Sequence, residues 1–340
     1  MEENNNKIIN RNASASVFGL EFQVNAAILL MIENIKNAIS IKIEGKYEDI
    51  ELKLNNQKTI YAQAKSVVKL DDYTNVIKNL KKSLETLNDT CSKVNNVEKL
   101  IYITNTSNPF NDIETMVYFI GYTKLSYEEL PDKAKIKIDK IINKKEFYNI
   151  DKSLLNIYVL PFYGNNKENR YKIIKNKVRD FIEELDIWNI RIDLLLSIWQ
   201  NEYFKNATLK NSELTVTKED FAWAIIVLGM GDYIEEENVD EAILIEINNK
   251  YRNLINHYEN KFELITKILF DYNEFEGSNI SKEKLESFIN NKFKDYYFEI
   301  FHNDNSIDKE IKEQIIKSII RQILSKRILI DKVRKGVSLN

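Results

Sequence analysis

The sequence is poor in residues on which several common chemistries depend. Among its 340 residues there is one cysteine, Cys91, so no disulfide can form within the chain, and we expect a reducing compartment. The two histidines, His257 and His302, lie in no HxxxH or HxH pair, which argues against zinc and HNH-type chemistry. We interpret both as ordinary surface or core residues. No histidine lies near Ser66 in the sequence to activate it as a hydrolase nucleophile.

Other motifs are missing as well. No GxxxxGK[ST] loop is present, and Gly229-Met230-Gly231 is a lone GxG, so no ATP site is indicated. No run of 18 apolar residues occurs, and the N-terminus lacks the apolar region of a signal peptide. These absences predict a cytoplasmic protein that spans no membrane and takes its regulation and any energy input from partners or ligands.

The composition that is present is typical of a soluble globular protein, with 44% hydrophobic and 30% charged residues. The net charge of −3 weighs mildly against a nucleic-acid-binding protein. Three stretches are nevertheless locally basic: Lys65–Lys82, Lys133–Lys145 and Lys167–Arg179. Each stretch is either the solvated face of a helix or a patch that contacts phosphates.

Hydrophobic spacing predicts an α+β protein in three regions. Residues 1–13 are expected to be a disordered lead, 14–165 an α/β domain and 166–340 a mostly helical domain. In the α/β domain the expected order is helix, three strands, helix, strand and a further strand, at 15–37, 39–43, 49–54, 59–67, 71–87, 100–104 and 157–160. Asn55-Asn56 is expected to form the hairpin turn between the second and third strands. The later helices are expected at 166–186, 187–206, 218–230, 239–272, 281–299 and 307–334.

A group of polar residues is expected to converge at one edge of this sheet. Gln63 and Lys65 point the same way on the third strand because strand side chains alternate between faces. The hairpin brings Asp49 close to Gln63, and Glu44 ends the first strand. Two carboxylates, an amide oxygen and a lysine suit phosphodiester hydrolysis, with hard oxygen ligands for Mg²⁺ or Mn²⁺. An exposed hairpin in a Glu- and Lys-rich protein would carry the same residues by chance.

The order Asp49…Gln63-x-Lys65 resembles the PD-(D/E)xK nuclease signature, with glutamine in the (D/E) position. Gly19-Leu20-Glu21-Phe22-Gln23 is similar to the GxxF[EQ] helix of Mrr-like restriction nucleases. Residues 14–165 resemble the double-stranded-DNA endonuclease domain of CD-NTase-associated (CBASS) effectors, which recurs in the nuclease subunit of Lamassu, an SMC-like three-component antiphage defence system. The segment from Tyr102 to Phe110 is also similar to these proteins. The resemblance implies a restriction-endonuclease-like core of helix, three strands, helix and strand.

This resemblance implies a role for each residue. Asp49 would be the principal metal ligand, Gln63 a neutral ligand and Lys65 the catalytic lysine. Glu44 would supply a second carboxylate, and Gln23 would approach from the first helix. Glu48 could exchange roles with Asp49. DNA would be contacted by lysines that follow the site: Lys69, Lys78, Lys81 and Lys82.

The helical half favours an SMC-linked effector over a CBASS effector, whose sensor domain alternates strands and helices. We expect residues 166–340 to be a docking and assembly domain that an SMC-like ATPase complex and a small accessory subunit hold inactive, with a homo-oligomer on activation. Four aromatic residues mark either a docking surface or core: Trp188, Trp199, Phe221 and Trp223. The alternatives are a CBASS nuclease gated by a cyclic oligonucleotide, or a scaffold that binds duplex DNA without cutting it.

Overall fold

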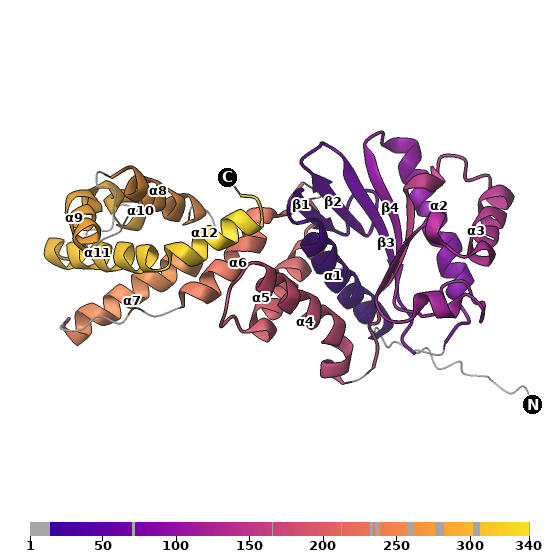
Figure 1. The fold of residues 1–340 in the computed structure, drawn as a ribbon, viewed down its shortest axis with the longest axis horizontal. Helices are drawn as coiled ribbons and strands as arrows, with labels where there is room; N and C mark the ends of the chain where they lie inside the picture. Colours follow the sequence, from indigo (N-terminus) through magenta and orange to yellow (C-terminus); the bar gives the residue numbers. More distant parts are fainter. Residues whose placement is uncertain are drawn as a thin grey trace, which may run out of the picture. The chain divides into compact units, whose positions relative to one another are not determined.

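The chain folds as an α+β protein with a seven-stranded mixed sheet and many helices (Figure 1). The computed structural model describes residues 14–69, 72–164, 166–211, 213–231, 234, 239–256, 261–275, 282–301 and 307–339. The expected disordered lead at 1–13, together with His257 and His302, lies outside the described residues. The chain divides into two compact units, one of residues 1–181 and 196–218, the other of residues 182–195 and 219–340.

The first unit contains the sheet. Its α-helices and strands are α1 (Ser14–Asn34), β1 (Ala38–Ile43), β2 (Ile50–Leu54), β3 (Thr59–Lys65), α2 (Val76–Lys93), β4 (Val97–Thr104), β5 (Thr123–Ser126), α3 (Asp132–Lys145), β6 (Leu155–Val159), most of α4 (Lys167–Glu184) and of α5 (Ile192–Thr208), and β7 (Val216–Thr217). Short 3₁₀ turns lie at Met116–Phe119, Tyr127–Glu129 and Lys152–Leu154.

The strand order is β5-β6-β4-β3-β2-β1-β7. β1, β2 and β3 form an antiparallel meander, with Ile43 opposite Ile50 and Ile50 opposite Ala62. β3, β4 and β6 are parallel, so the carboxyl ends of these three strands meet at one edge. The helix that a parallel connection requires between β3 and β4 is α2.

Helices cover both faces of the sheet. α2 buries an apolar stripe at helical spacing and packs with α3 over the face that carries Tyr61 of β3 and Tyr102 of β4. By strand alternation, Ile60 and Ala62 point to the other face, where α1 contacts β1, β2 and β3. Figure 1 shows α1 on one side of the sheet and α2 and α3 on the other.

α1 is apolar on nearly all sides because it is a core helix. Residues 24–31 are all buried, including the polar Asn25. The side-chain amide of Asn25 donates to the Glu21 carbonyl and accepts from the side-chain amide of Gln200. By length and composition alone α1 could cross a membrane, and it is the one such helix in the described residues. Its burial against the sheet is what a core helix of a soluble protein shows.

Residues 196–218 belong to the unit that contains the sheet. The sequence patterns predicted one boundary, between residues 165 and 166. The buried Lys42 of β1 donates from Nζ to the Asn206 carbonyl at 2.8 Å, near the end of α5. Asn206 Oδ1 accepts from the Ile43 amide at 3.1 Å, and β7 pairs with β1. A lysine at a helix carboxyl end complements its unpaired carbonyls, so these residues hold α5 to the sheet edge.

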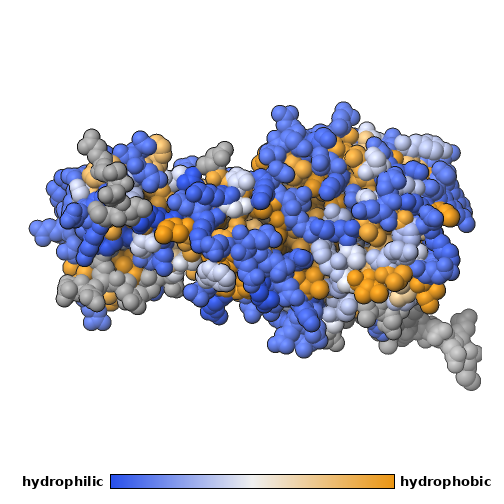
Figure 2. All heavy atoms as spheres, in the orientation of Figure 1, coloured by the Kyte–Doolittle hydropathy of each residue, from blue (hydrophilic) through white to orange (hydrophobic). Residues whose placement is uncertain are grey.

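The second unit is helical. Its elements include α6 (Lys218–Met230), α7 (Glu241–Asn256), α8 (Lys261–Glu274), α9 (Lys282–Lys292), α10 (Tyr297–Phe301), α11 (Lys309–Ser325) and α12 (Arg327–Gly336), with a 3₁₀ turn at Phe293–Tyr296. α11 contacts α7, α8 and α9 and buries a row of isoleucines: Ile315, Ile316, Ile319, Ile320 and Ile323. Figure 2 shows hydrophilic side chains over much of the viewed face, with apolar ones interspersed.

Most predicted elements are confirmed, and their errors follow a pattern. The meander, its turn at Asn55-Asn56 and the strands at 97–104 and 155–159 are present. Three elements were missed: β5, α3 and β7. The helix expected at 71–87 begins at Val76, and the single helices expected at 281–299 and 307–334 are each broken. The helix expected at 239–272 is described as α7 and α8, on either side of residues 257–260, which lie outside the described residues. Apolar spacing continues across such breaks, so it does not reveal them.

Candidate active site

The loop between β1 and β2 places two carboxylates at the sheet edge. Residues 44–49 bend back on themselves, and the Glu44 amide donates to the Asp49 carbonyl at 2.8 Å. Glu51 Oε1 accepts from the amides of Tyr47 at 2.6 Å and Glu48 at 3.2 Å. The carboxylate of Glu51 therefore fixes the loop from within, and the loop in turn fixes Glu48 and Asp49.

Asp49 forms an ion pair with Lys65 at the carboxyl end of β3. Asp49 Oδ2 lies 3.0 Å from Lys65 Nζ and accepts a second hydrogen bond from the Ala64 amide at 3.0 Å. The Asp49 side chain is 14% exposed and that of Lys65 is 29% exposed. Both charges are thus partly shielded from water yet accessible, as a site that binds and turns over an anionic substrate requires.

Glu48 is a buried carboxyl beside this ion pair. It is 3% exposed; Oε1 accepts from the Thr90 hydroxyl of α2 at 2.7 Å, and Oε2 has no hydrogen-bond partner among the described residues. Burial raises the pKa of Glu48 to about 7; the Asp49 charge adds to the rise, while Thr90, Gln63 and Lys65 oppose it. A carboxyl that titrates near neutrality with one unsatisfied oxygen is poised to take a proton or a cation.

The structure brings together some of the predicted residues. Asp49 and Lys65 are in contact, and the buried Gln63 lies beside Glu48. The Glu44 side chain is exposed and its backbone has a φ of 51°. Glu48 is a second carboxylate at the site, buried beside Gln63.

Gln23 lies on α1, an element separate from the loop and strand that carry Asp49, Gln63 and Lys65. This helix packs on the sheet face opposite to α2 and Glu48. Its Oε1 is buried without a hydrogen-bond partner among the described residues. One turn earlier on α1, a Cβ atom added at Gly19 would lie 4.0 Å from Ser66 Oγ, next to Lys65.

The oxygen donors at the site fit a hard divalent cation such as Mg²⁺ or Mn²⁺. The carboxylates of Asp49 and Glu48 and the amide of Gln63 offer oxygen ligands, and the unsatisfied Glu48 Oε2 is the atom that a cation would complete. Within the described residues, no group of three or more His, Cys, Asp or Glu residues could hold a metal. Two carboxylates with a neutral amide are a low-charge donor set, so we expect weak binding in the absence of an anionic substrate.

Asn105 is a positioning residue that sequence reasoning missed. It is fully buried at the carboxyl end of β4; its Nδ2 donates to the Val67 carbonyl at 2.8 Å and the Phe162 carbonyl at 2.7 Å. Its Oδ1 accepts from the Val67 amide at 2.8 Å. The side chain of Asn105 thus joins the segments that follow β3, β4 and β6. Its partner after β3 is Val67, two residues beyond Lys65. The asparagine stands in the noted segment from Tyr102 to Phe110, but its partners are distant in sequence.

The lysines expected to contact DNA lie along the first turns of α2 and the loop before it. Lys78 and Lys82 line a hollow of about 350 Å³ together with Ser66, Val67, Val68, Asp72, Asn75 and Asn79. Lys69 is exposed in the loop between β3 and α2, and Lys81 is half-exposed on α2. The hollow begins next to Lys65, so this part of α2 adjoins the candidate site.

The aromatic residues of the helical half are mostly core. Trp199, Phe221 and Trp223 are buried, and the Trp223 indole donates to the Ile255 carbonyl at 3.2 Å. Trp188 differs, since it is 69% exposed. Three of the four residues therefore cannot mark a docking surface in this conformation.

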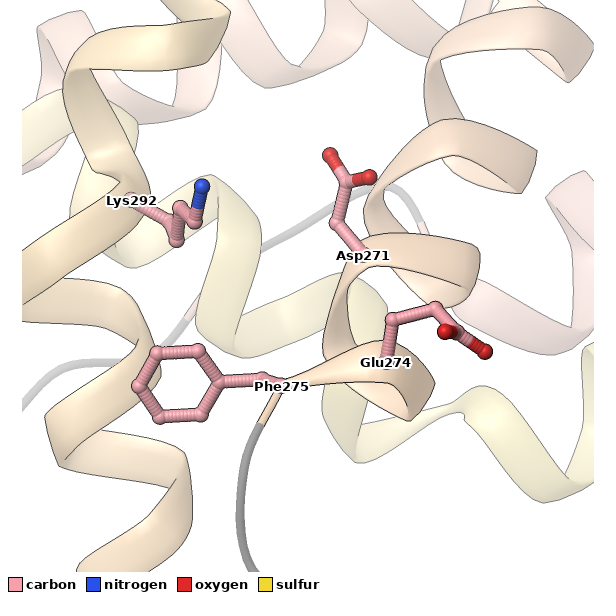
Figure 3. A pocket seen from close by; sticks show the side chains of 4 residues that line it. All are labelled: Asp271, Glu274, Phe275 and Lys292. Carbon is pink, nitrogen blue, oxygen red and sulfur yellow. The ribbon is translucent and has the colours of Figure 1, made fainter.

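The second unit has a hollow of its own, of about 320 Å³, beside α8 and α9 (Figure 3). Asp271, Glu274, Phe275 and Lys292 line it; in Figure 3 Asp271 and Lys292 point into the gap and Glu274 points away. Asp271 accepts from the Tyr296 hydroxyl at 2.7 Å, and Lys292 pairs with Asp295. Two carboxylates against one paired lysine disfavour an anionic ligand here.

Comparison of the chain with protein-family models, with curated proteins and with solved structures gave no match. The geometry of the site is therefore the basis for any statement about function.

Proposed function

We propose that this chain is a metal-dependent endonuclease that cuts double-stranded DNA. The observation that carries the proposal is the ion pair between Asp49 and Lys65 at the carboxyl end of β3, with the buried Glu48 carboxyl beside it. A lysine, two carboxylates and an amide oxygen at one sheet edge are the groups that phosphodiester hydrolysis uses. The order α1, β1-β2-β3 meander, α2, β4 is the order that a restriction-endonuclease-like core would have, which supports the same proposal.

Each residue has a distinct task in this proposal. Asp49, Glu48 and Gln63 would hold Mg²⁺ or Mn²⁺, which supplies a polarised water and neutralises charge on the phosphate. Lys65 directs its ammonium group toward the anionic phosphate and stabilises the negative charge that develops during attack. Asp49 and the Ala64 backbone orient Lys65 through the bonds to Oδ2. In the metal-free protein, burial raises the pKa of Glu48 to about 7, so binding of the cation would displace a proton from this carboxyl at neutral pH.

The test is cleavage of plasmid DNA by the full chain with Mg²⁺ or Mn²⁺, with EDTA as the metal-free control. Lys65→Ala and Asp49→Ala should each lower the rate by roughly 100-fold or more while the protein stays folded. Lys58→Ala is the matched control. Lys58 directly precedes β3, at the other end of the strand from Lys65, and forms an exposed ion pair with Glu98. A folded Lys65→Ala protein that cuts at the wild-type rate would remove the site. Binding of duplex DNA without any cleavage would instead favour the scaffold function.

We further propose that the enzyme is a cytoplasmic antiphage effector, held inactive by an SMC-like ATPase complex with a small accessory subunit and activated by release and homo-oligomerisation. A sequence-tolerant nuclease must be gated, and the second unit is a large helical body that can bind partners. The hollow lined by Asp271 and Glu274 does not suit an anionic cyclic oligonucleotide. Mass and activity measured across concentration test this: full activity as a monomer would contradict assembly. Activation of a purified oligomer by a cyclic oligonucleotide would favour the CBASS alternative.

A further inference from the structure

Five lysines, three on α2 and two in the last turn of α3, form no salt bridge in the part of the chain that the structure describes. Most neighbouring lysines are paired: Lys65 with Asp49, Lys93 with Asp89, Lys133 with Glu114, Lys137 with Asp112 and Lys152 with Asp139. No salt bridge within the described residues involves these five, Lys78, Lys81, Lys82, Lys144 and Lys145, or Lys135 and Lys140 farther back on α3. Glu85 of α2 is an acidic neighbour of Lys81, so the positive charge of this surface is compensated only in part by the described residues.

Two of these lysines are brought into direct contact. The ammonium groups of Lys81 on α2 and Lys145 at the end of α3 are adjacent, and this neighbour lowers the pKa of Lys81, with Lys144 adding to the effect. Leu84 of α2 and Ile138 of α3 belong to one buried cluster, which holds both helices on the same face of the sheet. The Asn149 amide also donates to Asn88 Oδ1 at 3.0 Å. Like charges held close are unfavourable unless an anion lies between or over them.

The lysine surface is continuous with the candidate active site. Lys78, Lys81 and Lys82 follow one side of α2 at helical spacing, opposite to the buried Leu80 and Leu84. The hollow lined by Lys78 and Lys82 begins at Ser66, the residue after Lys65. In Figure 2 the surface over α2 and α3 is largely hydrophilic, which disfavours an apolar partner.

We propose that α2 and the carboxyl end of α3 form a single phosphate-binding surface, in which Lys144 and Lys145 bind the backbone of duplex DNA together with Lys78, Lys81 and Lys82. The surface leads the duplex backbone from the end of α3 along α2 to the strand end at Lys65. Phosphate contacts of this kind position a duplex without reading its sequence. The choice of duplex DNA as the ligand rests on the nuclease function proposed above. The inference that the surface binds phosphates rests on the lysines themselves.

The experiment measures binding of a fluorescein-labelled duplex by the full-length Lys65→Ala protein in EDTA, across salt concentrations. On this background, Lys81→Glu and Lys145→Glu should each weaken binding and lower the slope of log K against log salt by about 1. Lys93→Glu is the matched control: it lies at the far end of α2, is exposed and is already paired with Asp89. It should leave the slope close to that of the parent protein.

A stability measurement separates phosphate binding from a structural effect. Lys81→Glu gains an attraction to Lys145 but loses the one to Glu85, so its unfolding temperature should change little although its DNA affinity falls. Wild-type affinity and slope in both Lys81→Glu and Lys145→Glu would overturn the proposal. A wild-type protein that shows this lysine-dependent slope but never cuts DNA would keep the binding surface and remove the nuclease function. A protein that cuts DNA while both variants bind normally would do the reverse.

Discussion

A Cβ atom added at Gly45 would lie 2.5 Å from the Glu51 carboxyl carbon and from its Oε1 atom. That oxygen accepts the two amide hydrogen bonds, from Tyr47 and Glu48, that hold the loop. A side chain at position 45 would therefore displace the Glu51 carboxylate from the space that it occupies. The loop that carries Glu48 and Asp49 depends on this approach.

Gly45→Ala should therefore destabilise the protein by about 2 kcal/mol, because Glu51 must leave at least one charged hydrogen bond to make room. Denaturant unfolding measures the loss. Gly19→Ala on α1 is the control, since its nearest neighbour would be 4.0 Å away, and it should stabilise the helix by up to about 1 kcal/mol. Equal stability of the wild-type and Gly45→Ala proteins would show that the loop does not need Glu51.

Glu48→Gln should stabilise the protein above neutral pH and have little effect in acid. The folded-state pKa of Glu48, about 7, is raised above its ordinary 4.5, so the folded protein binds this proton more tightly than the unfolded chain. Wild-type stability then falls as pH rises from about 4.5 to about 7 and levels off above that range, by about 3 kcal/mol in total. Glutamine keeps an oxygen for the Thr90 hydroxyl but cannot ionise.

Urea unfolding in EDTA at pH 4 and pH 8 checks this pH dependence. The stability difference between Glu48→Gln and wild type should grow by about 3 kcal/mol between the two pH values. Glu44→Gln, an exposed residue of the same loop, should show no such growth. The same small difference at both pH values for Glu48→Gln would mean that Glu48 is not buried in solution.

Local sequence patterns predicted the elements that build the site better than the site itself. Strand alternation and the Asn55-Asn56 turn were enough to bring Asp49, Gln63 and Lys65 to one edge. The same reasoning named Glu44, at the end of the first strand, as the second carboxylate and left Glu48 as an exchange for Asp49. The positive φ of Glu44 and the turn held by Glu51 redirect the β1–β2 loop, so Glu48 faces α2. Such tertiary contacts have no period in the sequence.

Asn105→Ala should slow DNA cleavage more than it weakens DNA binding. It leaves the Val67 amide and the carbonyls of Val67 and Phe162 buried without their partner, so we expect about 3 kcal/mol of lost stability. The backbone that follows Lys65 then loses its anchor, and small misplacement of a catalytic group reduces rate rather than affinity. Single-turnover rates and duplex affinity, measured on protein shown to be folded, separate the two effects.

The control for the Asn105 prediction is Asn156→Ala on β6, whose amide bonds only the nearby Leu154 carbonyl. It should leave the cleavage rate unchanged. Asn105→Asp retains the shape but places a carboxylate against two carbonyls, so it should be at least as harmful as alanine. Equal losses of affinity and rate in Asn105→Ala would assign Asn105 to general folding stability instead.

Gln63→Glu should make the protein more dependent on a divalent cation. The new carboxyl would be buried beside Glu48, and two neighbouring carboxylates repel each other and resist ionisation. Without metal the variant should therefore be less stable than wild type at pH 8. With Mn²⁺ the added carboxylate becomes a stronger ligand than the amide oxygen, and a tenfold gain in affinity adds about 1.4 kcal/mol at saturating metal.

Thermal unfolding with Mn²⁺ and with EDTA should show a larger metal-dependent shift of the unfolding temperature in Gln63→Glu than in wild type. Gln23→Glu, on the opposite face of the sheet, should show the wild-type shift. If Mn²⁺ moves the unfolding temperature of neither wild type nor Gln63→Glu, the cation does not bind between Glu48, Asp49 and Gln63.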